Sequence, residues 1–228
     1  MWSNTAMDVT LALTSLAHLL VLVYWLGGDV GAFLSSRIVT DANKSAPARI
    51  AAAGILANVD MAPRSALILA APTGISLALA KGWVTMPAWQ PTTIWVASLT
   101  WLVIAWIIHL KHLAPGAPLR RLDLVVRWLV LVKLIAVALW PGAIFGFGPL
   151  PLFLKLKCAI LAACIGCGLA IRALLGPFGP AFAALARDGP SLAGDAAIAA
   201  SLSRARPIVV LLWTLLLCAA FVGLAQPT

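Results

Sequence analysis

The sequence predicts an all-α fold: a polytopic integral membrane bundle of about six transmembrane helices, with the N-terminus outside. Hydrophobic residues make up 63% of the 228 positions and charged residues only 10%, whereas a soluble domain carries about 25% charged residues. The apolar residues also gather into runs of roughly 20, the length that a helix needs to cross a bilayer. Both observations argue against a soluble enzyme.

Six apolar runs are predicted to span the membrane, at residues 9–33, 64–81, 92–112, 122–140, 152–174 and 207–225. Between the first two, residues 41–60 are rich in alanine with charges at both ends, and we expect a short helix on the membrane surface. Residues 176–206 contain Gly-Pro pairs, which predict a loop with short helical pieces.

The basic residues predict the orientation. With the N-terminus outside, twelve of the 16 lysines and arginines fall in inner segments and three in outer segments, while Lys133 lies within a span. Cytoplasmic segments are enriched in Lys and Arg, so both termini are expected to face outward from a bacterial inner (plasma) membrane. The net charge of +9 therefore indicates contact with the lipid bilayer, and no nucleic-acid partner is expected.

Two polar residues at similar depth identify a candidate site. His18 lies roughly 14 Å into the first span, at 1.5 Å per residue, and Lys133 lies roughly 11 Å from the outer end of the fourth. A charged residue at a helix centre costs about 2.5–3.5 kcal/mol, so such residues usually face the bundle interior and have a partner. We therefore expect His18 and Lys133 to share an internal site.

Helical spacing adds further residues to this site. One stripe of the first span consists of His18, Leu22, Trp25 and Asp29. Trp25 is therefore expected beside any cofactor that His18 holds. The opposite face carries Gly27 and Gly31, a pair that admits a neighbouring helix. Asp29, near the inner end, is expected to form a structural ion pair with Arg64 at the start of the second span.

Other polar residues have two interpretations each. His18 is either a buried imidazole bonded to a neighbouring carbonyl, or a neutral imidazole that ligates haem iron or transfers a proton. For His109 and His112, we favour the interpretation of a solvated basic cap, and the alternative is a metal or haem-propionate contact. Cys164 and Cys167 are favoured as small packing residues over a zinc or redox pair.

Three segments, taken in order, resemble the HemJ-type membrane proteins. HLLVLVYWLGGDVGAFLSSR is similar to that family's first helix. MAPRSALILAAP resembles its M-E-R-R-L-Y-x-x-x-x-x-P segment, in which Met61, Arg64 and Pro72 keep the mutual spacing. WLVLVKLIAVALW resembles its W-L-x-x-K-L helix, with the Trp128–Lys133 spacing two residues longer. The copper-resistance D proteins belong to the same broad neighbourhood.

The resemblance covers about residues 15–140 and implies a HemJ-like four-helix core over residues 1–150, followed by two additional helices over 151–228. It implies b-type haem, a protoporphyrinogen oxidase activity with a porphyrin substrate, and quinone or another electron carrier as partner. By position, it implies His18 as the axial iron ligand. It also implies catalytic roles for Lys133, beside a haem propionate or substrate carboxylate, and for Arg64.

The chain departs from the family at two places, and two other functions stay open. Ala62-Pro63 replaces the second glutamate-arginine step, and Trp140 stands near the place of a missing histidine. In the first alternative, His18, Lys133 and Asp29 line a polar pathway of a permease or copper-handling protein. In the second, the chain is a structural subunit of a membrane complex; a homo-oligomer is compatible with any of the three.

Overall fold

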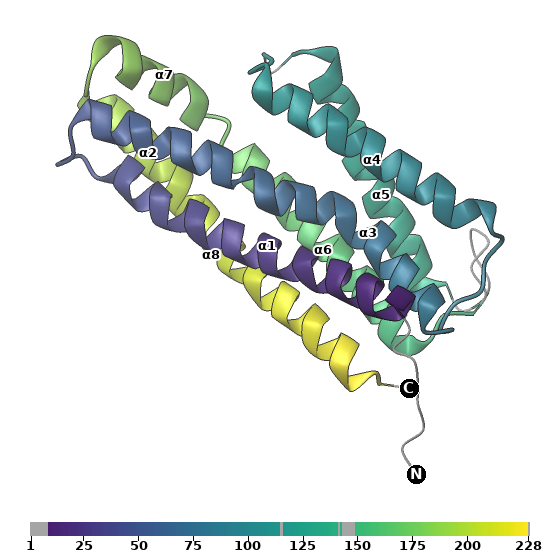
Figure 1. The fold of residues 1–228 in the computed structure, drawn as a ribbon. Helices are drawn as coiled ribbons and strands as arrows, with labels where there is room; N and C mark the ends of the chain where they lie inside the picture. The colour runs from purple at the N-terminus through teal and green to yellow at the C-terminus, as the bar shows by residue number, and fades with distance from the viewer. Residues whose placement is uncertain (1–8, 115, 141, 143–148, 228) are drawn as a thin grey trace.

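The structure, a computed structural model, describes residues 9–114, 116–140, 142 and 149–227, and all regular secondary structure in this part of the chain is α-helical (Figure 1). The helices are α1 (Val9–Thr40), α2 (Ala46–Val59), α3 (Met61–Ala80), α4 (Trp89–Leu110), α5 (Pro118–Leu139), α6 (Leu152–Leu174), α7 (Phe178–Asp188) and α8 (Leu192–Ala225). The predicted all-α class is confirmed.

Five helical segments of the described residues are long and apolar enough to cross a membrane: Val9–Thr40, Ala46–Ala80, Trp89–Leu110, Leu152–Leu174 and Leu192–Ala225. The fourth expected span, residues 122–140, forms most of α5 but is not among them. It carries Asp123, Arg127 and Lys133, so it is less apolar than the others. The composition of α5 therefore does not by itself mark it as a sixth span.

Residues 46–59 do not form a separate surface helix. Only Asp60 separates α2 from α3, and the two helices continue in one direction alongside α1 (Figure 1). Pro63 lies in the first turn of α3. Proline is tolerated there because the first N–H groups of a helix have no partner within it.

The expected loop at residues 176–206 is mostly helical, which corrects the prediction. It forms α7 and the first turns of α8, a helix of 34 residues. The break between them falls at Gly189, whose φ of 85° is unfavourable for other residues. Ser191 then caps α8, its side chain accepting a hydrogen bond from the Gly194 backbone N–H at 3.1 Å.

One hydrophobic core joins the two expected parts of the chain. Its buried residues come from α1, α3, α4, α6 and α8, and so from both sides of residue 150. A second cluster lies at the other end of the bundle and joins α1, α2, α7 and α8. Within the expected four-helix core, residues 1–8 and 143–148 lie outside the described residues.

Helix α1 approaches α2 and α3 closely through two glycines. A Cβ on Gly28 would lie 2.5 Å from Pro63 Cδ, and one on Gly31 would lie 3.0 Å from Val59 Cγ1. The expected pair included Gly27 instead of Gly28, but a Cβ on Gly27 would meet nothing within 4 Å. This close contact aligns α1 with α3 and so positions the polar residues that the two helices share.

Candidate functional site

His18 lies in the interface between α1 and α3. Its Nδ1 is 3.1 Å from the hydroxyl of Thr73, a buried residue of α3. The imidazole packs against Gly74, where a Cβ would lie 3.2 Å from His18 Cε1. The absent side chain at Gly74 therefore makes the space that the ring occupies.

The hydrogen bonds of Thr73 favour one tautomer of the imidazole. The Thr73 hydroxyl donates to the Leu69 carbonyl at 2.7 Å, so its oxygen is left to accept. His18 Nδ1–H is then the donor to Thr73, and Nε2 keeps its lone pair. A neutral imidazole fixed in this way can take a proton or a metal ion on Nε2.

The positive charge of Lys157 on α6 acts on this histidine. The Lys157 ammonium itself reaches α8, where a Cβ on Gly223 would lie 2.7 Å from Nζ. Lys157 is half-buried, roughly 8 Å from the start of α6. None of the ion pairs in the described part of the chain includes Lys157. Among the described residues, the positive charge that acts on the imidazole therefore has no carboxylate paired with it.

Lys133 does not share this site. It is exposed on α5, and α5 packs against α4 and α6. Helix α1 packs instead against α2, α3 and α8. The depth estimate placed His18 and Lys133 at similar levels, but equal depth does not make two helices neighbours.

Asp29 does not form the expected ion pair with Arg64. Arg64 pairs with Asp60, four residues earlier on the adjoining turn, and half of its side chain is exposed. A partner one turn away is reached without crossing to another helix. Asp29 Oδ2 is buried and has no hydrogen-bond partner among the described residues.

Trp25 is buried in the hydrophobic core, together with Val21 of α1 and Leu67 of α3. Its place is that of a packing residue next to the polar stripe. The stripe itself is real: His18, Leu22 and Asp29 are partly buried, while Leu19, Val23 and Val30 of the same helix are exposed.

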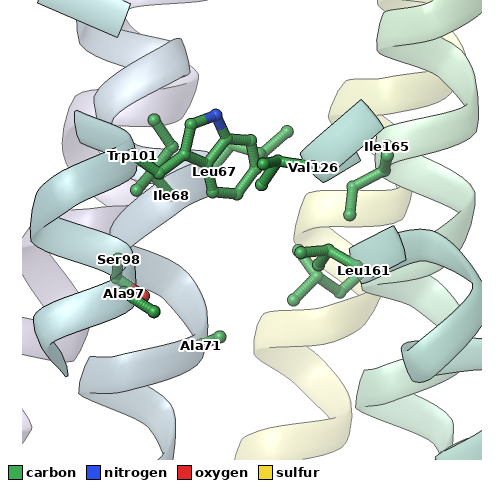
Figure 2. Close-up of a pocket in the computed structure, with 10 residues that line it drawn as sticks. Leu67, Ile68, Ala71, Ala97, Ser98, Trp101, Val126, Leu161 and Ile165 are labelled. Carbon is green, nitrogen blue, oxygen red and sulfur yellow. The ribbon is translucent and has the colours of Figure 1, made fainter. Parts of the chain in front are cut away.

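A pocket with a cavity volume of about 110 Å³ lies between α3, α4, α5 and α6 (Figure 2). Its lining is almost wholly apolar: Leu67, Ile68, Ala71, Ala97, Ser98, Trp101, Val126, Val130, Leu161 and Ile165. Figure 2 shows Trp101 and Ala97 on one side and Leu161 and Ile165 on the other. His18 is not among the lining residues.

The site satisfies one requirement of a haem and fails another. His18 Nε2 is a suitable iron ligand, and Lys157 would suit a propionate. The imidazole, however, is packed against Gly74. The pocket described above does not include His18 in its lining, so it is not a haem cavity at this histidine.

The remaining residues considered as metal ligands are His109, His112, Cys164 and Cys167. No group of three or more His, Cys, Asp or Glu residues that could hold a metal ion occurs in the described ranges. His109 Nε2 is hydrogen bonded to Asn58 Oδ1 at 3.1 Å, and its ring lies 6.3 Å from that of His112. Cys164 and Cys167 are buried in the core cluster.

Comparison of the chain with protein-family models, curated proteins and solved structures finds no match.

Lys157 is the residue that the sequence did not single out. It was counted among the outer basic residues because it lies near the start of the fifth predicted span. The sequence does contain a sign that Lys157 lies inside the helix, because five apolar or basic residues of α6 precede it. Which residues surround Lys157, however, depends on the packing of α6 against α8, and a single sequence does not reveal this packing.

Proposed function

We propose that this chain is a multi-pass membrane permease, with its N-terminus on the outer side of a bacterial inner membrane, that carries a small carboxylate-bearing solute together with a proton. The observation that supports this proposal is an ammonium whose charge acts on a neutral imidazole and that has no carboxylate partner among the described residues. Charged residues inside membranes mark substrate and proton pathways.

The chemistry follows from the charge of Lys157 and the neutral ring of His18. An unpaired ammonium inside the bundle favours an anionic partner, and a solute carboxylate supplies one. While Lys157 is unpaired, its charge opposes a second positive charge on His18. A carboxylate on Lys157 removes that opposition, so Nε2 of His18 can take up a proton. Solute and proton therefore bind with positive coupling, and each favours the other equally.

Asp29 offers a second proton acceptor on the same helix. It lies eleven residues beyond His18, roughly 16 Å along α1, and its Oδ2 is buried without a partner among the described residues. Protons need only single water molecules or side chains as carriers, so this route requires no open channel between the two groups.

Reconstituted vesicles test this function. With pyranine trapped inside, an inward gradient of lactate, succinate or benzoate should acidify the lumen faster than in protein-free vesicles. His18→Gln should abolish the difference, while His112→Gln, an exposed histidine at the end of α4, should preserve it. Acidification at the protein-free rate for every carboxylate would reject the permease.

The second candidate is b-type haem binding with a protoporphyrinogen oxidase activity and transfer of electrons to quinone. The Nε2 lone pair of His18 favours it, and the close packing of the ring against Gly74 argues against it. A reduced-minus-oxidised absorption spectrum of the purified protein separates the candidates: a b-type spectrum that His18→Gln removes supports haem. A featureless spectrum after incubation with haem rejects it.

A further inference from the structure

A cluster of cations and aromatic rings lies in the seam between α1 and α8, away from His18. At its centre is Phe33 of α1. The Trp213 ring meets it edge-on, with centroids 5.3 Å apart. The guanidinium carbons of Arg37 and Arg206 lie 5.4 Å and 5.9 Å from its centroid. Two like charges therefore share one ring.

Neither of these cations has a counter-charge within the part of the chain that the structure describes. Neither Arg37 nor Arg206 takes part in an ion pair of the described residues. Arg206 Nη2 donates to Thr40 Oγ1 at 3.3 Å, and this is an uncharged acceptor. Two isolated surface arginines would need no explanation, but these two converge on one residue between two helices.

Two buried donors in the same seam also lack acceptors in the described ranges of the chain. Arg206 Nε and Trp213 Nε1 have no hydrogen-bond partner among the described residues, although both atoms are shielded from solvent. A buried donor left unpaired costs about 1–3 kcal/mol. Donors that flank one ring and have no acceptor indicate that a ligand with several oxygens belongs here.

The order of these groups along α8 indicates which kind of ligand. Arg206 directly precedes the most apolar part of α8, and Trp213 lies seven residues further in, roughly 10 Å deeper. Exposed apolar side chains flank the seam on both helices: Leu34 and Ile38 on α1, and Val210 and Leu217 on α8. A free phosphate ion has no use for the deeper donor or for this apolar flank.

We infer that the α1–α8 seam binds one anionic glycerophospholipid, with its phosphate on Arg37 and Arg206. A glycerol ester carbonyl then accepts from Trp213 Nε1, and an acyl chain covers the exposed apolar flank. Basic pockets between transmembrane helices bind anionic headgroups in this way. The proposal is independent of the carboxylate site, because it involves none of that site's residues.

Thermal unfolding in detergent tests the site. Phosphatidylglycerol should raise the Tm of the wild-type protein, whereas phosphatidylcholine and inorganic phosphate should not. The double variant Arg37→Gln/Arg206→Gln should lose the shift produced by phosphatidylglycerol. Arg204→Gln removes an exposed arginine two residues from Arg206 and should keep it.

A milder variant covers the case in which the double variant does not fold. Trp213→Phe keeps the ring against Phe33 and removes only the N–H, so it should fold and show a smaller shift with phosphatidylglycerol than the wild type. An equal shift in all variants, a loss of the shift in Arg204→Gln, or an equal shift with inorganic phosphate would overturn the lipid site.

Discussion

Two buried charged clusters in this bundle differ in how far their charges are compensated. Asp123 of α5 accepts hydrogen bonds from Trp101 Nε1 at 2.9 Å, Arg127 Nε at 3.1 Å and Arg172 Nη1 at 3.0 Å. The charge of Lys157 acts on His18, and Lys157 has no ion pair among the described residues. The first cluster joins three helices through satisfied groups, and the second leaves a charge available to a ligand.

The comparison predicts opposite effects on stability. A satisfied cluster loses stability when its acceptor is removed, because the buried donors, here Trp101 and Arg127, are left without one. A buried cation without a counter-charge lowers the stability of the folded state and is retained for function. Its replacement by an apolar residue should therefore raise the free energy of unfolding.

The largest effect is expected at Asp123. Asp123→Asn should lower the free energy of unfolding by about 3 kcal/mol, since it leaves Arg127 and Arg172 without a counter-charge. Chemical unfolding in mixed micelles measures this change. Asp188→Asn is the control, because its pair with Arg187 is at the surface, and it should produce no measurable change. Equal stability of the two variants would contradict the structural role of Asp123.

A change of opposite sign is expected at Lys157. Lys157→Met removes a half-buried charge and keeps the length of the side chain, so the free energy of unfolding should rise by about 1–2 kcal/mol. Carboxylate-dependent proton uptake should be lost in the same variant. Lys155→Met, two residues away on α6, should leave uptake unchanged. If Lys157→Met is less stable than the wild type, the ammonium has a partner that stabilises the fold.

A smaller effect is expected from Gly74→Ala. The new methyl group would lie 3.2 Å from His18 Cε1 and should displace the ring from Thr73. We expect a roughly tenfold slower proton uptake and a loss of about 1 kcal/mol in stability. Gly168→Ala on α6 meets nothing within 4 Å, and it should add about 0.5–1 kcal/mol to stability. Unfolding and uptake measurements on both variants show whether space at Gly74 matters.

The smallest effect is expected at Arg64. Its pair with Asp60 is half-exposed and spans one helical turn, so Arg64→Gln should cost about 0.3–0.5 kcal/mol. Uptake should not change, because Arg64 contacts neither His18 nor Lys157 through any hydrogen bond or ion pair of the described residues. A loss of uptake in this variant, with normal stability, would place Arg64 in the mechanism.

The sequence predicted what depends on local pattern. Hydropathy predicted the all-helical class, and 3.6-residue spacing predicted that His18 and Asp29 face inward. The predictions that were wrong concern which residues of different helices lie close together. Lys133 and Lys157 both stand in apolar runs, and only the packing of α6 against α8 and of α5 away from α1 distinguishes them. The Asp29–Arg64 pair failed because Asp60 offers Arg64 a nearer carboxylate.

The most direct test compares the two lysines in one assay. Vesicles with wild-type protein, Lys157→Gln or Lys133→Gln are given the same carboxylate gradient, and internal acidification is followed with pyranine. A permease that uses His18 and Lys157 predicts uptake in the wild type and in Lys133→Gln, with none in Lys157→Gln. Loss of uptake in Lys133→Gln, with uptake retained in Lys157→Gln, would contradict the proposed site.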